Sequence, residues 1–344
     1  MSDRTLLRVR DLCKYFPVWK QGLMRRRVGE VRACDQLNFD LMEGETLGLV
    51  GESGCGKTTT ARTILRAIEP TSGHVFFRRN GGEVDLAVLP ERDIRTLRTE
   101  MQMIFQDPFS SLNPRMTVGK IVAEPLKIHK VASGKEMWKR VDEMLERVGL
   151  RSEHRQRYPH AFSGGQRQRI GIARALVLQP RLIVADEAVS ALDVSVQAQV
   201  INLLQDLQDE FGLTYIFVAH DLAVVRHICD RIAVMYAGKI VELAPAAELF
   251  ENPLHPYSHA LLSAIPQTDP HVRLEPVMTG SVADPANLPP GCSFHPRCNQ
   301  CFEPCDHVLP QLEEVSPNHW VACHLHTQAD APALVSSGIG EGEA

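Results

Sequence analysis

The chain has 344 residues, of which 44% are hydrophobic and 23% are charged, and its formal net charge is −5. This length suits one large domain with an appendage, or two domains, and it is sufficient to bury a sizeable core. The acidic balance provides no overall basic surface, so we expect no nucleic-acid partner. No uncharged apolar run approaches the roughly 18 residues of a membrane-spanning helix, and the first residues lack a signal-peptide core. We therefore expect a cytoplasmic protein whose nine cysteines are reduced.

The amino-terminal segment predicts two strands. Residues 6–12 alternate between apolar and polar side chains, like an edge strand, and the aromatic residues Tyr15 and Phe16 follow. An aromatic ring here could stack on a purine base or simply pack on the strand. The second strand is expected over residues 31–41. The basic stretch at residues 20–32 is interpreted as a loop that faces solvent or lipid head groups.

A phosphate-binding loop is the most informative motif. It fits the pattern G-x-x-x-x-G-K-[ST], it follows an apolar strand at residues 46–50, and it precedes a helical run at residues 59–68. The motif comprises Gly51, Glu52, Ser53, Gly54, Cys55, Gly56, Lys57, Thr58 and Thr59. Its glycines let backbone N–H groups face phosphate oxygens at the positive end of a helix. Lys57 is expected to reach the β- and γ-phosphates and Thr58 to bind Mg²⁺. The alternative, a turn with an exposed lysine, is disfavoured because every pattern position is filled.

Two carboxylates end a second buried strand. In the stretch 181–187, the apolar residues 182–185 lead to Asp186 and Glu187, and ligands collect at the carboxyl edge of parallel sheets. Asp186 suits Mg²⁺, and Glu187 suits orientation and deprotonation of an attacking water. A simple strand cap is the alternative. His220 ends a further buried strand at residues 214–219, which should neighbour the first, so a γ-phosphate contact is favoured over a structural histidine.

A glutamine and a second anion site complete the set. Gln106 follows a short strand at residues 101–105, where its amide could reach Mg²⁺ and a water or cap the strand. Residues 111–159 have helical periodicity, and Ser163 is a good N-cap for a helix at residues 167–179. The anion site consists of Ser163, Gly164, Gly165 and Gln166. A helix over residues 196–211 and a hairpin over 232–243 end the main domain.

Taken together, these motifs resemble the ATP-binding subunits of ABC transporters. The resemblance covers about residues 5–245 and includes the phosphate loop, Gln106, the signature at residues 162–166, the strand ending in Glu187, and His220. It implies an α/β P-loop NTPase with a RecA-like core, an antiparallel β subdomain and a helical signature subdomain. We assign residues 1–250 to the ATPase domain and about 107–178 to the helical subdomain.

The resemblance also implies a mechanism in which two subunits bind head to tail and ATP lies between the phosphate loop of one and the signature of the other. The implied catalytic residues are Lys57, Gln106, Glu187 as the general base, and His220. The implied Mg²⁺ ligands are Thr58, Gln106 and Asp186. The implied nucleotide-binding residues are Phe16, Gly51, Ser53, Gly54, Cys55, Gly56, Lys57, Thr58, Thr59, Ser163, Gly164, Gly165, Gln166 and Asp193. Ala188 and Val189 depart from the more usual proline and threonine, and Phe162 replaces a leucine, without changing a catalytic group.

The carboxyl-terminal third narrows the resemblance. Residues 252–258 and 260–266 look like the extension of importers of dipeptides and oligopeptides, and most closely that of the second of their two paired ATPases. The implied partners are two transmembrane permease subunits, a second homologous ATPase or another copy of this chain, and indirectly an extracytoplasmic solute-binding protein. The protein would then be peripheral on the cytoplasmic face of the inner membrane. Importers of opines, oligosaccharides or nickel, and a soluble ABC ATPase outside transport, are the alternatives.

Five cysteines cluster in this extension, which we assign to residues 251–326. Cys292, Cys298, Cys305 and Cys323 are separated by five, six and seventeen residues, and Cys301 is an extra member. Such thiols could hold a [4Fe–4S] cluster or zinc, or could be free. The resemblance to peptide importers favours the [4Fe–4S] cluster, held by Cys292, Cys298, Cys305 and Cys323. Histidines that could assist zinc are His295, His307, His319 and His324. Residues 327–344 are expected to be a disordered tail.

Overall fold

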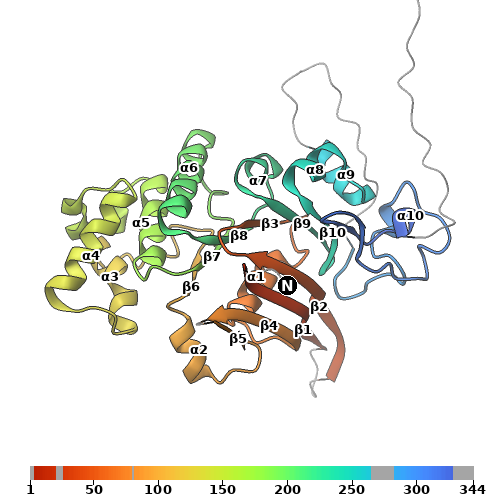
Figure 1. Cartoon of the computed structure of the whole chain (residues 1–344), viewed down its shortest axis with the longest axis horizontal. Coiled ribbons are helices and arrows are strands. Elements are labelled where there is room, and N and C mark those ends of the chain that lie inside the picture. The colour runs from red at the N-terminus through yellow and green to blue at the C-terminus, as the bar shows by residue number, and fades with distance from the viewer. Residues whose placement is uncertain (1–3, 21–25, 80, 265–282, 328–344) are drawn as a thin grey trace, which may run out of the picture.

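The computed structural model describes residues 4–20, 26–79, 81–264 and 283–327. Two sheets form its centre, with a group of helices at one end and the carboxyl-terminal extension at the other (Figure 1). Nearly all of the predicted tail and part of the predicted basic loop lie outside the described residues. Within the four described ranges, no helix is long and apolar enough to span a bilayer.

The larger sheet carries the carboxylates predicted from the sequence. Its strands, in spatial order, are β11 (Glu313–Ser316), β12 (His319–Val321), β10 (Lys239–Pro245), β9 (Arg231–Tyr236), β3 (Thr46–Val50), β8 (Thr214–Val218), β7 (Leu182–Asp186) and β6 (Met101–Ile104). The run from β9 to β6 is parallel. Every residue of β3, β7 and β8 is buried, which explains their unbroken apolar sequences. Their carboxyl ends therefore meet at one edge, where the motif residues follow.

The smaller sheet is antiparallel, and its strand order corrects one prediction. It consists of β2 (Arg26–Met42), β1 (Thr5–Lys20), β4 (Ser72–Arg79) and β5 (Gly82–Asp85). The expectation of an edge strand at residues 6–12 is wrong, because β1 pairs with β2 on one side and β4 on the other. The alternation instead reflects one face that is buried on the core beneath the sheet. Helix α1 (Lys57–Ile64) contributes Ala61 and Ile64 to that core.

The helical end comprises the segment between β6 and β7. Its elements are α3 (Val118–Ile128), α4 (Gly134–Arg147), η1 (Ser152–Gln156), η2 (Pro159–Ala161) and α5 (Gly164–Leu176). Helix α4 buries Met137, Val141, Met144 and Leu145, which share one helical face. Helix α5 contacts α3, α4 and β6, and so joins the helical end to the sheet. The remaining helices before β9 are α2 (Glu91–Leu97), α6 (Val194–Phe211) and α7 (Leu222–Ile228).

The extension is built onto the main sheet, because β12 pairs with β10. Its helical elements, after the connecting α8 (Ala246–Glu251), are α9 (Pro256–Ser263), η3 (His295–Arg297) and α10 (His324–Thr327). The fully buried Glu242 of β10 accepts hydrogen bonds from the backbone N–H groups of Leu254 and His255 and from His319. Burial alone would raise the pKa of Glu242, but these hydrogen bonds lower it. An ionised carboxylate therefore anchors both ends of the extension.

Candidate functional site

The phosphate loop turns between β3 and α1 in a backbone path that only glycine fits. Gly51 has φ 150° and Gly56 has φ 110°. A Cβ at Gly51 would lie 2.2 Å from the carbonyl oxygen of Met235, and one at Gly56 would lie 2.0 Å from that of Ala33. The loop is therefore held tightly between β9 and β2.

Lys57 lies inside this loop. Its side chain is only 5% exposed, and Nζ donates hydrogen bonds to the carbonyl oxygens of Gly51 at 2.7 Å and Glu52 at 3.0 Å. The ammonium is thus positioned at the amino-terminal end of α1, where backbone N–H groups favour an anion.

Thr58 and Asp186 meet although they are 128 residues apart. The Thr58 hydroxyl donates to Asp186 Oδ1 at 2.7 Å, and Arg62 lies 3.7 Å from the other carboxylate oxygen. Burial raises the pKa of Asp186, and the Thr58 hydrogen bond and the charge of Arg62 only partly offset this effect. A hydroxyl and a buried carboxylate in contact fit a hard divalent cation such as Mg²⁺, which stabilises the ionised carboxylate.

Gln106, Glu187 and His220 come together on one carboxylate oxygen. The Gln106 amide donates to Glu187 Oε2 at 2.7 Å, and His220 Nδ1 lies 3.4 Å from the same atom. These residues follow β6, β7 and β8, and the pairing of Asp186 with Val218 confirms that β7 and β8 are neighbours. The meeting of the three side chains follows from adjacent parallel strands ending at one edge.

The backbone of Glu187 is strained. Its φ is 48°, in the left-handed region, and its N–H donates to the carbonyl oxygen of Val218 at 2.9 Å. A non-glycine residue in this region costs about 1–3 kcal/mol and persists where surrounding structure fixes it. The strain turns the Glu187 side chain towards Gln106 and His220 instead of continuing the strand.

The signature residues form a well-defined helix start away from the phosphate loop. Ser163 Oγ accepts from the Gln166 N–H at 3.4 Å, and Gln166 Oε1 accepts from the Ser163 N–H at 3.1 Å, which makes a capping box. Gly165 is buried against α6, where a Cβ would lie 2.4 Å from a methyl group of Val196. Helix α5 is well separated from α1 (Figure 1). In the described part of the chain, no hydrogen bond or ion pair joins the signature to its own phosphate loop.

Of Tyr15 and Phe16, the two aromatic residues considered for base stacking, only Phe16 is left as a candidate. The Tyr15 hydroxyl donates to Asp35 at 2.6 Å, so this side chain is held by a contact within the fold. The Phe16 side chain is 38% exposed, and Lys14 Nζ lies 5.0 Å from its ring centre. Asp193 is exposed at the N-cap of α6.

Four cysteines line one pocket in the extension. They are Cys292, Cys298, Cys305 and Cys323, and His255, His295 and His324 also line this pocket. Burial raises the thiol pKa to about 11 for Cys292 and about 12 for Cys323, so a nearby cation would be needed to hold these thiols ionised. The exposed Cys301 is not part of the lining.

Two of the histidines predicted as possible zinc ligands, His295 and His324, lie beside the four thiols. Among the described residues, no three His, Cys, Asp or Glu side chains are arranged around a position for a single metal ion. Two of the histidines predicted as possible ligands have carboxylate partners: His319 contacts Glu242 at 2.7 Å, and His307 contacts Asp306 at 2.6 Å.

Comparisons with known proteins agree with this geometry. A family model described as "ABC transporter" matches residues 34–190, and one described as "Oligopeptide/dipeptide transporter, C-terminal region" matches residues 241–305. The oligopeptide transport ATP-binding protein AppF of Bacillus subtilis is 52% identical, over 95% of this chain and 99% of that protein. The chain belongs to the ATP-binding proteins of peptide ABC transporters. It is therefore an ABC ATPase, as the motifs predicted.

Other relatives support the same conclusion. A probable peptide ABC transporter ATP-binding protein, y4tS of Sinorhizobium fredii, is 49% identical, over 98% of this chain and 95% of that protein. A dimeric ATP-binding cassette, MJ0796, bound to ADP and Pi has a TM-score of 0.60 and 29% identity, over 70% of this chain and 99% of that chain. CbiO1 from Clostridium perfringens has a TM-score of 0.61 and 27% identity, over 73% of this chain and 92% of that chain. These matches confirm the predicted ABC ATPase fold.

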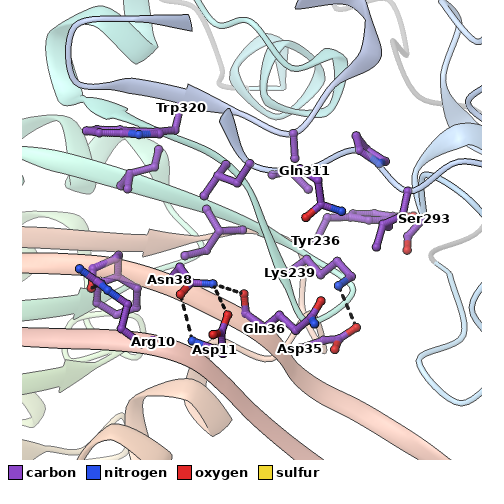
Figure 2. A pocket seen from close by; sticks show the side chains of 18 of the residues that line it. Arg10, Asp11, Asp35, Gln36, Asn38, Tyr236, Lys239, Ser293, Gln311 and Trp320 are labelled. Atoms are coloured by element: carbon purple, nitrogen blue, oxygen red, sulfur yellow. Dashed lines mark hydrogen bonds and ion pairs between the residues drawn. The ribbon is translucent and has the colours of Figure 1, made fainter. Parts of the chain in front are cut away.

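A large cavity in the ATPase lies away from the phosphate loop. It has a volume of about 600 Å³ and is enclosed by β1 and β2, by β9 and β10, and by the segment 292–322 of the extension. Figure 2 shows side chains that line it, among which Lys239 lies 2.9 Å from Asp35 and the Asn38 amide donates to Asp11. The cavity thus lies between the extension and the smaller sheet.

Three residues at the nucleotide loop have contacts that the sequence did not predict. No role was expected for Arg297 or Tyr257, and none for Glu52 beyond its place in the pattern. Arg297 forms two hydrogen bonds with the Glu52 carboxylate, and the Tyr257 hydroxyl accepts from the Glu52 N–H. The sequence does show an arginine between two of the clustered cysteines and an acidic residue within the phosphate loop. Because 245 residues separate the two, the sequence gives no indication that they form a pair.

Proposed function

We propose that this ATPase hydrolyses ATP to drive peptide import, bound to two permease subunits as a peripheral protein on the cytoplasmic face of the inner membrane. The observation that carries the hydrolytic role is the convergence of Gln106 and His220 on the Glu187 carboxylate, beside Thr58 and Asp186. Peptide as the solute is supported by the relatives' names and by the match of the extension to the oligopeptide and dipeptide transporter region.

In the proposed mechanism the loop binds and orients the triphosphate. Lys57 exchanges its hydrogen bonds with the carbonyl oxygens of Gly51 and Glu52 for the β- and γ-phosphates. Thr58 and Asp186 would hold Mg²⁺, with Gln106 as a further ligand, and the ion when bound neutralises charge on the phosphate oxygens.

Glu187 would then accept a proton from the attacking water. Its oxygen already accepts a hydrogen bond from Gln106, so the amide can orient both the carboxylate and the water. His220, 3.4 Å from the same oxygen, would donate to the γ-phosphate as negative charge develops there. The three side chains act together because three adjacent strand ends fix their positions.

A second ATPase subunit would complete each nucleotide site. The exposed start of α5 is an anion site separate from its own phosphate loop, so Ser163, Gly164, Gly165 and Gln166 would contact the nucleotide of a partner in a head-to-tail dimer. The dimeric cassette with ADP and Pi supports this arrangement. The partner would be a homologous ATPase or another copy of this chain. Phe16 would stack on adenine, and Asp193 would lie at the dimer interface.

We also propose the domain limits 1–250 and 251–326, with a helical subdomain at about 107–178.

Reconstitution tests this function. With cognate permeases and binding protein in proteoliposomes, we expect added peptide to raise the ATPase rate several-fold and to accumulate inside the vesicles. The matched control omits the permeases. Stimulation by an opine, an oligosaccharide or nickel but not by peptides would favour the alternative solutes, and no permease-dependent change would favour an ABC ATPase that acts outside transport.

We further propose that Cys292, Cys298, Cys305 and Cys323 hold a [4Fe–4S] cluster. The support is that the four thiols line one pocket, as the four cysteine ligands of such a cluster require. The cluster would cross-link the extension, and no redox step is proposed.

Anaerobically purified protein should contain about four irons and absorb broadly near 400 nm. Cys298→Ser should lose the iron, whereas Cys301→Ser should retain it; zinc alone, or no metal, would contradict the proposal.

A further inference from the structure

The extension reaches into the phosphate loop through an arginine. The Arg297 guanidinium places Nη1 2.7 Å from Glu52 Oε2 and Nη2 2.9 Å from Glu52 Oε1, which is a two-point pairing of the planar groups. Arg297 is only 7% exposed, and it ends η3 between Cys292 and Cys298. A bidentate pair with so little solvent around the arginine fixes distance and direction better than a surface ion pair does.

A tyrosine of the extension holds the backbone of the same loop residue. The Glu52 N–H donates to the Tyr257 hydroxyl at 2.8 Å. Tyr257 is fully buried, and its ring packs against those of Tyr236 at 4.8 Å and Phe294 at 5.3 Å between centres. This aromatic cluster joins α9, β9 and the segment that leads into η3, so the hydroxyl has little freedom to move.

Glu52 connects these contacts to the catalytic lysine. Its carboxylate binds Arg297, its N–H binds Tyr257, and its carbonyl oxygen accepts from Lys57 Nζ at 3.0 Å. A shift of Glu52 would therefore move one of the two carbonyl oxygens that hold the Lys57 ammonium until phosphates take their place. The large cavity lies between the smaller sheet and the extension (Figure 2), and the extension meets the nucleotide-binding edge through Arg297 and Tyr257.

Charge gives the arginine a second role. An acid in a phosphate-binding loop repels the triphosphate, and the repulsion is strong where solvent is scarce. Arg297 neutralises Glu52 from the side of the extension. Removal of Arg297 would therefore harm nucleotide binding in two ways, because it frees the loop and exposes an uncompensated negative charge.

We propose that Arg297 and Tyr257 are positioning residues through which the carboxyl-terminal extension holds the phosphate loop in its ATP-binding form. The inference deepens the ATPase role proposed above and rests on it. Both contacts end on a single residue of the phosphate loop, Glu52, so a change in the extension at η3 or α9 would reach the loop through that residue.

The test measures the affinity of the full-length protein for ATP and for a fluorescent ATP analogue, without hydrolysis. Arg297→Met is expected to weaken binding roughly tenfold or more, and Arg297→Lys should restore part of the loss because it keeps the charge. Adding Glu52→Gln to Arg297→Met should recover only the part of the loss that the uncompensated carboxylate causes, because the loop still lacks its contact with Arg297. Tyr257→Phe removes only the hydroxyl and should give a smaller loss.

A matched control separates loop positioning from general destabilisation. Arg231→Met breaks a comparable pair, in which Arg231 lies 3.0 Å from Glu45 at the opposite end of β3. It should lower the thermal unfolding temperature without changing ATP affinity. Unchanged affinity in Arg297→Met, or losses that simply add in the double variant, would overturn the inference. Because binding is measured apart from transport, failure of the importer assignment would leave this result interpretable.

Discussion

Replacement of Glu187 by glutamine should reduce ATP hydrolysis by roughly 10²- to 10⁴-fold while ATP binding persists. Glutamine keeps the size of the side chain and an oxygen that can accept from Gln106 Nε2, now 2.7 Å from the carboxylate. It cannot accept a proton from water at neutral pH. The change therefore removes the general base and leaves the phosphate loop, Thr58 and Asp186 as they are.

Phosphate release and nucleotide affinity should be measured on the same Glu187→Gln sample. Because ATP would bind without being consumed, we also expect an ATP-dependent dimer by size exclusion, whether the partner is a second copy or the homologous ATPase. Glu210→Gln is a suitable control, since Glu210 pairs with Arg147 on the surface, 2.8 Å away, and this variant should hydrolyse ATP normally. Undiminished hydrolysis in Glu187→Gln would refute the assignment of the general base.

Much of the nucleotide site was predictable because its residues are tied to strand ends. A buried apolar run identifies a parallel strand, and the residue after it must lie at the carboxyl edge. The apolar runs that precede Asp186, Glu187 and His220 were therefore enough to predict that these side chains share one edge. What they could not predict is the left-handed backbone of Glu187, because Ala188 and Val189 carry no turn signal that requires it.

The sequence did not predict features that depend on a contact with a distant part of the chain. The alternation at residues 6–12 reveals one buried face but not how many strands lie alongside, so the sequence predicts an edge strand where β1 pairs on both sides. The Arg297 pairing with Glu52 depends on the path of the chain through the extension, which no local pattern specifies. For the cysteines, the position of the site was predictable but its occupant was not. Spacing predicts a shared site, and the structure places the four thiols in one pocket, but spacing does not determine whether such thiols bind a cluster, zinc or no metal.

Substitution of Gly56 by alanine should abolish measurable ATP binding, with an affinity loss of at least roughly 100-fold. The new Cβ would lie 2.0 Å from the carbonyl oxygen of Ala33 on β2, and both atoms belong to rigid backbone. The left-handed φ of 110° adds a cost of about 1–3 kcal/mol. The loop can relieve the collision only by moving away from β2, which displaces Lys57, the next residue.

The matched control for this substitution is Gly44→Ala. Gly44 also has a positive φ, 79°, but a Cβ there has no neighbour within 4 Å. It therefore carries the backbone cost without the collision, and it should lower thermal stability modestly while ATP still binds. Circular dichroism would establish that Gly56→Ala remains folded, and titration with ATP would measure the loss. Equal affinities for the two variants would mean that the phosphate loop tolerates displacement, and that its close contact with β2 does not set the position of Lys57.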